Sequence, residues 1–354
     1  MNYEQLKFKT DIEKEDLVFY DLRSGAFDVY GLYDYKNQDA FIRLPQQVAD
    51  TVNEGVAHLH RESAGGRIRF SSDSPYLAIK IEYEQVAPEI QAAMNRQAGC
   101  DVYVHTDLGF EFITCIAPSG DQKEGFAKCY DFGEKKMRSY TINMPFHGHV
   151  KNLYIGLSAD AVIGEGKKYI NEKPVVFYGS SITQGASASR PGNTYENIIS
   201  LRMNLNYTNL GFAGNAFGEV TIAEYIKNLD MTAFVCDYDH NAPDPQHLLE
   251  THKRFYDIVR STNPDLPYIM CTRPYFRNHD LDCIRRREIV LDTYHQAIAA
   301  GDRNVFFVDG ETYFTADETP FCSADCVHPN DYALMKMANT IEPVIKKALE
   351  YKLK

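Results

Sequence analysis

A chain of 354 residues is too long for one ordinary hydrophobic core, so its length predicts two domains. Its content of 44% hydrophobic and 24% charged residues is typical of globular proteins and argues against disorder. The formal net charge of −12 argues against nucleic acid and anionic membranes as partners, because both bind clustered Lys and Arg.

The amino terminus and the cysteines indicate in which cellular compartment the protein is expected. Residues 1–9 contain no apolar signal core, so a cytoplasmic protein is expected. The eight cysteines form no C-x-x-C pair and lie mostly in apolar, strand-like segments, which favours reduced, buried thiols.

The pairs His58-x-His60 and His147-x-His149 would each share a strand face, but no recognisable ligand set accompanies them. We interpret them as structural or surface histidines and expect neither a metal nor a cofactor.

The first half of the chain consists of short β-rich runs broken by Gly, Asp, Pro and Asn. Many short strands with turn signals between them predict an antiparallel β-sandwich, placed at residues 1–165. A linker is expected at 159–173, which contains two glycines and adjacent lysines. The predicted strands are 27–30, 66–70, 77–83, 100–104, 140–144 and 150–157.

From residue 174 onward, strand-like runs alternate with helical patterns. Parallel strands need crossover connections, so this alternation predicts a parallel, doubly wound α/β sheet over residues 174–354. The predicted strands are 175–178, 207–210, 233–237, 268–272 and 305–308. The predicted helices are 194–203, 221–228, 246–261, 280–299 and 332–351.

A serine follows the first of these strands. The apolar run 175–178 ends abruptly in Gly179-Ser180-Ser181, and a polar, helix-opening segment comes next. Ligands bind at the carboxyl ends of strands in open α/β sheets, so Ser181 is a candidate nucleophile. Near the other end of the chain, Asp325 and His328 are close enough for the carboxylate to reach the imidazole. We expect His328 to act as the base and Asp325 to orient it.

Acyl transfer also needs hydrogen-bond donors aimed at the developing oxyanion. Gly214 follows the second strand, and glycine permits close approach to its backbone N–H. Asn241 follows the third strand and can donate from its side-chain amide. Both residues are expected on the rim of the sheet that carries Ser181.

These residues make the segment from about Pro174 onward resemble the SGNH (GDSL-type) hydrolase superfamily. The resemblance implies a flavodoxin-like, three-layer α/β/α fold and metal-independent ester hydrolysis. It also implies an oxyanion hole formed by Ser181 N–H, Gly214 N–H and the Asn241 amide. The marker residues of the superfamily correspond to Ser181, Gly214, Asn241 and His328, with Asp325 as the triad carboxylate.

Two departures from the family pattern suggest a divergent branch. The common Gly-Asp-Ser is Gly179-Ser180-Ser181 here, and the Asp of the common Gly-x-Asn-Asp is replaced by Ala242. Neither departure removes a triad or oxyanion group.

The first half is similar to the jelly-roll-like sandwich that precedes the catalytic domain in family two carbohydrate esterases. This similarity rests on the architecture and on residues 65–74, and it implies an acetylated saccharide as substrate. Arg67 and Arg69 share a strand face there, which could line a polar substrate wall, although we favour a solvated face or part of an interface. The run Arg285-Arg286-Arg287 is likewise interpreted as a solvated helix face.

The sequence therefore predicts a serine esterase that removes O-acetyl groups from sugars or oligosaccharides, such as acetylxylan fragments. Phe212, Phe217 and Tyr238 are expected to crowd its acyl pocket towards acetate. One alternative is a lysophospholipase or thioesterase. Another is a catalytically silent saccharide-binding protein, suggested by the altered loop at 179–181. Whether the chain forms a homo-oligomer is left open.

Overall fold

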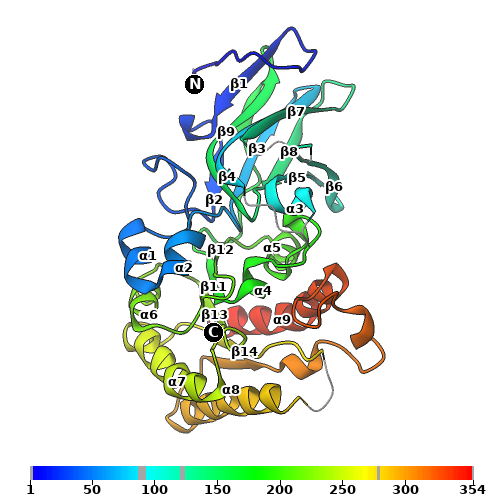
Figure 1. The fold of residues 1–354 in the computed structure, drawn as a ribbon. Coiled ribbons are helices and arrows are strands. Elements are labelled where there is room, and N and C mark those ends of the chain that lie inside the picture. The colour runs from blue at the N-terminus through cyan, green and yellow to red at the C-terminus, as the bar shows by residue number, and fades with distance from the viewer. Residues whose placement is uncertain (1–2, 87–92, 120–123, 277–279, 353–354) are drawn as a thin grey trace. The chain divides into compact units, whose positions relative to one another are not determined.

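The structure is a computed structural model that describes residues 3–86, 93–119, 124–276 and 280–352. The chain forms two compact units, each with its own core (Figure 1). The sandwich unit comprises residues 1–43, 61–169 and 189–192, and the α/β unit comprises 44–60, 170–188 and 193–354. The domain boundaries expected from sequence, 1–165 and 174–354, stay a prediction. The two units differ from them mainly because 44–60 belongs to the α/β unit.

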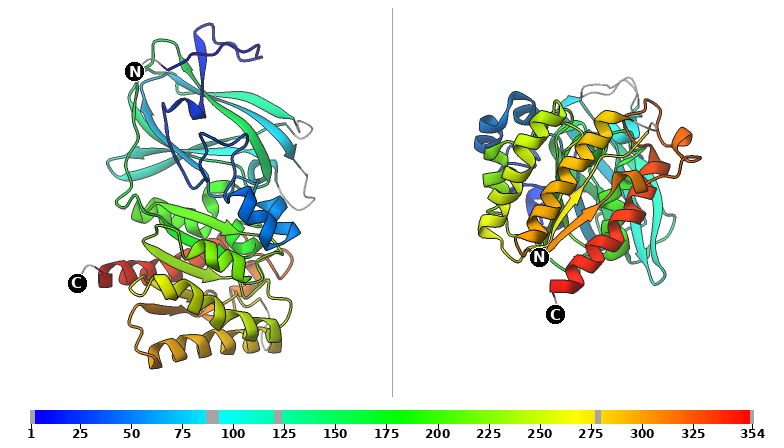
Figure 2. Two further views of the ribbon diagram at one scale, coloured as in Figure 1. Left: turned by 90° about the vertical axis from the view of Figure 1, so that its left-hand side faces the viewer. Right: turned by 90° about the horizontal axis from the view of Figure 1, so that it is seen from below.

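The sandwich unit contains two antiparallel sheets, as the sequence predicted (Figure 2). Ile79 and Ile81 from one sheet share a core with Ile68 and Phe70 from the other, so the apolar faces of both sheets are buried together. The first sheet has the order β1 (Leu17–Asp21), β9 (Gly148–Ser158), β4 (Tyr76–Val86) and β7 (Gly125–Asp131). The second has the order β10 (Ile163–Glu165), β3 (Arg67–Ser72), β8 (Arg138–Asn143), β5 (Cys100–Thr106) and β6 (Gly109–Ile116), with β2 (Asp28–Tyr30) also on β3.

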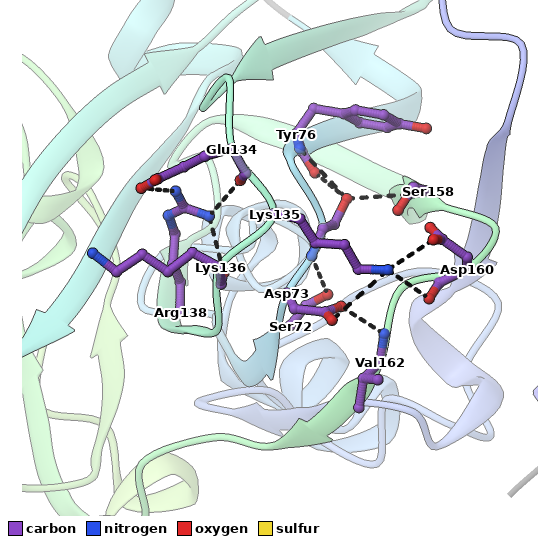
Figure 3. A network of polar contacts seen from close by, with 11 residues as sticks. Ser72, Asp73, Tyr76, Glu134, Lys135, Lys136, Arg138, Ser158, Asp160 and Val162 are labelled. Atoms are coloured by element: carbon purple, nitrogen blue, oxygen red, sulfur yellow. Dashed lines mark hydrogen bonds and ion pairs between the residues drawn. The ribbon is translucent and has the colours of Figure 1, made fainter.

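The predicted linker at 159–173 is wrong in its first part. β10 lies within it and pairs with β3, with Ile163 opposite Ser72. The residues just before β10 are also held, because Val162 N–H donates to Asp73 Oδ1 at 2.8 Å (Figure 3). Lys135 Nζ lies 2.7 Å from the Asp160 carboxylate in the same network. Part of this Gly- and Lys-containing segment is therefore an edge strand and not a linker.

Arg67 and Arg69 do share a strand face, and that face is not solvated; the interface alternative stays a prediction. Both side chains are fully buried. Arg67 Nε donates to Tyr169 Oη at 2.8 Å, and the Arg69 guanidinium lies 3.5 Å from the centre of the Tyr169 ring. Stacking on an aromatic ring and hydrogen bonding offset the cost of burying these two charges.

The α/β unit contains a five-stranded parallel sheet, which confirms the predicted fold class (Figure 1). Tyr178 stacks on Phe255 with ring centres 5.0 Å apart, whereas its neighbour Phe177 contacts Tyr195 on the opposite face. Helices therefore cover both faces and make three layers. The strand order is β12 (Tyr207–Gly211), β11 (Val175–Gly179), β13 (Ala233–Asp237), β14 (Tyr268–Cys271) and β15 (Val305–Val308).

The helices of this unit form two groups. Figure 2 shows α5 and α9 together on one face of the sheet and α6, α7 and α8 on the other. In the part of the chain that the structure describes, no helix combines the length and apolar composition needed to cross a bilayer. The helices are α4 (Ser181–Gln184), α5 (Tyr195–Met203), α6 (Val220–Ile226), α7 (Pro245–Thr262), α8 (Leu281–Ala299) and α9 (Asp331–Lys352).

Two short helices from the first half of the sequence also belong to the α/β unit. They are α1 (Gln46–Val52) and α2 (Glu54–Leu59), which the sequence pattern did not predict. Ala49 and Val56 are buried in the same core as residues of β11. The expected strand face for His58 and His60 is therefore wrong, because His58 lies in α2 and His60 is its C-cap residue.

Candidate active site

The carboxyl ends of three neighbouring strands meet at one edge of the parallel sheet. Gly179, the last residue of β11, pairs with Gly211 of β12 and with Asp237 of β13. A side chain at Gly179 would come within 2.0 Å of Thr183 Oγ1 and 2.4 Å of Asp237 O, so the turn after β11 requires glycine. The segments that carry Ser181, Gly214 and Asn241 all start from this edge, as the sequence predicted.

Ser181 is the first residue of α4. Ser180 caps this helix, since its Oγ accepts a hydrogen bond from Ile182 N–H at 3.1 Å. Backbone N–H groups in the first turn of a helix have no partner within the helix. Among the residues that the structure describes, Ser181 N–H has no acceptor, so it is available to a bound group.

Ser181, His328 and Asp325 form a continuous row of hydrogen bonds. Ser181 Oγ lies 2.9 Å from His328 Nε2, and His328 Nδ1 lies 2.7 Å from Asp325 Oδ2. The other carboxylate oxygen, Oδ1, accepts from His328 N–H at 2.8 Å and from Ser323 Oγ at 2.9 Å. Burial by itself would raise the pKa of Asp325, but these hydrogen bonds hold that pKa well below its usual range. Asp325 is thus an ionised acceptor that fixes the imidazole with Nε2 facing the serine.

Two further backbone features give Asp325 and His328 their positions. Cys326, between them, has φ +60°, which lets the chain turn sharply enough for the carboxylate to reach the ring. Asn330 N–H donates to Cys322 O at 2.9 Å and closes the base of this loop. The loop leads directly into α9.

The two predicted oxyanion donors are also without acceptors. Gly214 is exposed, has φ +70°, and its N–H has no acceptor among the described residues. Asn241 Oδ1 accepts from Ala216 N–H at 3.4 Å, which orients the amide. The other end of that amide, Nδ2, has no hydrogen-bond partner in the described part of the chain. Three N–H donors that follow adjacent strands are therefore available to an oxyanion.

The predicted acyl-pocket residues Phe212 and Tyr238 lie elsewhere. Both are buried in the core of the α/β unit. The Tyr238 ring stacks on His252, and its hydroxyl lies 2.9 Å from Thr251 Oγ1 on α7. The prediction is wrong for these two residues because their side chains point into the protein. Phe217 is half-buried on the loop after β12.

Arg286 is a residue of this site that the sequence analysis assigned wrongly. Its side chain is buried, and Nη1 donates to Asp239 O at 2.6 Å and to Ala242 O at 2.8 Å. Its Nε donates to Asp282 at 2.7 Å. The guanidinium therefore holds both ends of the segment that contains Asn241. Within the run 285–287, only Arg285 is exposed, so the prediction of a solvated face fails for the other two.

A buried carboxylate, also missed, lies beside the nucleophile helix. Asp237 Oδ2 accepts from Tyr195 Oη at 2.9 Å and from Thr183 Oγ1 at 3.1 Å, which ties α4 to β13. Burial, together with the nearby charge of Asp239, raises the pKa of Asp237 to about 7. Burial likewise raises the pKa of Asp239 to about 6. Nothing in the run that ends at Asp237 distinguishes it from an ordinary strand end.

Asp237→Asn is expected to gain stability relative to wild type as the pH rises. An unfolded aspartate has a pKa of about 3.9, so the folded wild type binds the extra proton between about pH 4 and 7 and loses stability across that range. The amide carries no charge, so the variant's free energy of unfolding should improve relative to wild type by about 2.6 kcal/mol between pH 5 and 8. Urea unfolding at both pH values measures this difference. An equal difference at pH 5 and 8 would contradict the raised pKa.

Among the described residues, neither His328 nor Asp325 belongs to a group of three His, Cys, Asp or Glu side chains that converges as metal ligands would. The site's reactive groups are instead a serine, an imidazole, a carboxylate and N–H donors. Together these groups suit nucleophilic attack on a carbonyl carbon.

Comparisons with known proteins agree with this arrangement. The model of the GDSL-like lipase/acylhydrolase family matches residues 172–346. The model of the N-terminus of SGNH-hydrolase-type esterases matches residues 17–163. No curated protein matches the sequence.

Among solved structures, a protein described as a GDSL-like lipase from Bacteroides ovatus is 26% identical, with a TM-score of 0.85 over 94% of this chain and 98% of that chain. A salicylyl acyltransferase from a tetracycline biosynthetic pathway is 19% identical, with a TM-score of 0.75 and coverage of 95% and 98%. An acetyl xylan esterase from Butyrivibrio proteoclasticus is 12% identical, with a TM-score of 0.62 and coverage of 95% and 99%. The last two show likeness of fold alone. Residues 172–346 therefore belong to the GDSL-like lipase/acylhydrolase family, a family of hydrolases, and residues 17–163 match the N-terminus of SGNH-hydrolase-type esterases.

Proposed function

We propose that this hydrolase is a serine esterase that removes O-acetyl groups from saccharides. The observation that carries the proposal is the row of hydrogen bonds from Ser181 Oγ through His328 to Asp325, at the carboxyl edge of the sheet. A serine hydroxyl is a weak nucleophile unless an adjacent base removes its proton, and this geometry supplies the base.

In the proposed reaction, Ser181 Oγ attacks the acetyl carbonyl carbon while His328 Nε2 takes the hydroxyl proton. The negative charge on the carbonyl oxygen is stabilised by Ser181 N–H, Gly214 N–H and Asn241 Nδ2. The imidazolium then gives its proton to the leaving sugar hydroxyl. Water, deprotonated by His328, attacks the acetyl-serine and releases acetate. Asp325 holds the ring in the tautomer that accepts at Nε2 and stabilises the imidazolium.

An acetylated saccharide is the substrate class favoured by the likeness to the acetyl xylan esterase, which extends over both units of this chain. The sequence similarity of the first half to family two carbohydrate esterases points the same way. The net charge of −12 is compatible with an uncharged substrate.

The decisive experiment compares acetate release from acetylated xylo- and manno-oligosaccharides with hydrolysis of p-nitrophenyl acetate, propionate, butyrate and octanoate. The Ser181→Ala protein serves as the blank. A saccharide esterase should prefer an acetylated oligosaccharide to p-nitrophenyl acetate and should lose activity as the acyl chain lengthens. Propionyl and longer esters hydrolysed as fast as acetyl would contradict acetyl specificity.

A second candidate, a lipase or thioesterase-type acylhydrolase, is favoured by the matched family model and by the lipase description of the Bacteroides ovatus protein. It predicts activity that rises with acyl-chain length in the same series. A catalytically silent saccharide-binding protein predicts sugar binding without labelling of Ser181 by a fluorophosphonate. The hydrogen-bonded Ser181–His328 pair argues against that alternative.

Arg286→Lys is expected to lower kcat for p-nitrophenyl acetate by about 10-fold while KM changes little. A lysine ammonium keeps the charge but cannot reproduce the guanidinium fork between Asp239 O and Ala242 O, so the Asn241 amide loses its alignment with the oxyanion. Arg285→Lys, a change in the exposed residue next to it, is the matched control. Equal kcat values for the two variants would show that Arg286 does not support the Asn241 segment.

A further inference from the structure

Asn53 joins two elements of the α/β unit that are far apart in sequence. It lies between α1 and α2, and its Oδ1 caps α2 by accepting from Val56 N–H at 2.8 Å. Its Nδ2 donates to Asn215 O at 3.0 Å and to Glu219 Oε1 at 2.5 Å. One side chain therefore caps a helix and holds residues 212–219, which we name the Gly214 loop.

Nearly all backbone N–H groups of the Gly214 loop have acceptors within the α/β unit. Within the described residues, every N–H from 212 to 218 has an acceptor except that of Gly214. The acceptors are Gly179 O, Gln184 Oε1, Phe212 O, Asn241 Oδ1, Glu219 Oε2 and Tyr178 Oη. These bonds fix the backbone on both sides of Gly214, so the direction of its N–H is set by how the loop is held.

Glu219 links Asn53 to this loop. Its Oε1 accepts from Asn53, and its Oε2 accepts from Phe217 N–H at 3.2 Å. Packing is equally close, because a Cβ added to Gly55 would come within 1.9 Å of the Asn215 side chain. The start of α2 thus lies directly against the outer side of the Gly214 loop, with no space for another side chain.

We propose that Asn53 is a positioning residue that holds the Gly214 loop so that Gly214 N–H points at the oxyanion. Its catalytic consequence rests on the esterase function proposed above. Tyr178 of β11 and Gln184 of α4 hold one part of the loop. Asn241 Oδ1 and His247 Nε2 also bond to it, at Ala216 N–H and Phe217 O. Asn53 holds it from the start of α2, at Asn215 O and Glu219 Oε1. Loss of the outer contacts leaves the loop folded but with a less well-defined Gly214.

The test compares Asn53→Ser and Asn53→Asp with Glu54→Gln, an exposed neighbour on α2, as the control. Ser and Asp both cap helices well, so α2 is retained in each variant. Asn53→Ser removes the amide donor to Asn215 O and Glu219 Oε1. Asn53→Asp removes the same donor and also places a carboxylate against these two acceptors. Since removal of one oxyanion donor lowers kcat by about 10²–10³-fold, we expect Asn53→Asp to lower kcat for p-nitrophenyl acetate by about 10–100-fold, with KM within about 3-fold of wild type.

Adding Glu219→Gln to Asn53→Asp supplies a donor to the new carboxylate and should recover part of the lost kcat. If Asn53 had only a structural role, Asn53→Asp would change the melting temperature but would not lower kcat while KM stayed near the wild-type value. Wild-type kcat in Asn53→Asp would overturn the catalytic role.

Hydrogen–deuterium exchange of peptides covering residues 212–219 tests the support of the loop without any activity. We expect exchange there to be at least about 10-fold faster in Asn53→Asp than in wild type, and unchanged in Glu54→Gln. Unaltered exchange would overturn the proposal. If wild type hydrolysed no ester while loop exchange still responded to Asn53→Asp, the proposed function would fail and the support of the loop by Asn53 would stand.

Discussion

Ser181→Ala is expected to lower kcat for acetyl ester hydrolysis by about 10⁵-fold or more. The change removes the attacking oxygen, and among the described residues no other hydroxyl is hydrogen-bonded to His328 Nε2. The fold should be retained, because within the described part of the chain the Ser181 side chain makes a single hydrogen bond, the one to His328. Single-turnover and steady-state assays with p-nitrophenyl acetate measure the loss, and circular dichroism checks the fold.

Ser180→Ala is the matched control for this prediction. Ser180 Oγ caps α4 through Ile182 N–H, so its loss should cost about 1 kcal/mol of stability. Because Ser181, and not Ser180, is hydrogen-bonded to His328 in the described structure, the Ser180 variant should keep activity within about 10-fold of wild type. Wild-type activity in Ser181→Ala, or a larger loss in Ser180→Ala, would show that the nucleophile has been assigned to the wrong residue.

Asp325→Asn is expected to lower kcat by about 10⁴-fold with little change in KM. An amide oxygen can still accept from His328 N–H and Ser323 Oγ, so the loop should keep its shape. The group facing His328 Nδ1 no longer carries a negative charge, so the tautomer with a free Nε2 is no longer favoured and the imidazolium is not stabilised. The rate of fluorophosphonate labelling of Ser181 should fall in parallel with kcat.

The same variant also tests the lowered pKa of Asp325. A carboxyl whose pKa is depressed by folding stabilises the protein above its unfolded pKa of about 4 and loses that contribution as the pH falls. Wild type should therefore exceed Asp325→Asn in unfolding free energy at pH 7, and the two should approach each other below about pH 4. Denaturation at pH 7 and pH 3 measures this. A difference that grows towards acid pH would contradict the ionised, hydrogen-bonded carboxylate.

Much of the α/β unit could be predicted from the sequence because its signals are local. The run 175–178 is continuously apolar and ends in a glycine that the turn requires. The other four predicted strands also correspond to β12 to β15, since buried parallel strands are apolar on both faces. Asp325 and His328 are only three residues apart, so their contact follows from chain geometry once a sharp turn forms.

Other features depended on partners that are distant in sequence. The helical pattern places Arg286 on a helix but does not reveal that Asp239 O and Ala242 O face it. Phe212 follows a strand like any loop residue, yet the structure buries it in the core. In the first half, β10 was hidden in a Gly- and Lys-containing segment because an edge strand is stabilised mainly by its neighbour.

The parallel sheet, the sandwich class and the residues that follow each strand could all be inferred before folding was considered. Apolar runs, turn residues and short spacings are encoded within a few positions of the chain. The partners of the buried charges, and the surroundings of the oxyanion donors, follow instead from contacts made in the folded chain. Asn53 illustrates the reason, since its two acceptors lie more than 160 residues away and hydrophobic periodicity carries no information about which backbone groups will face a polar side chain.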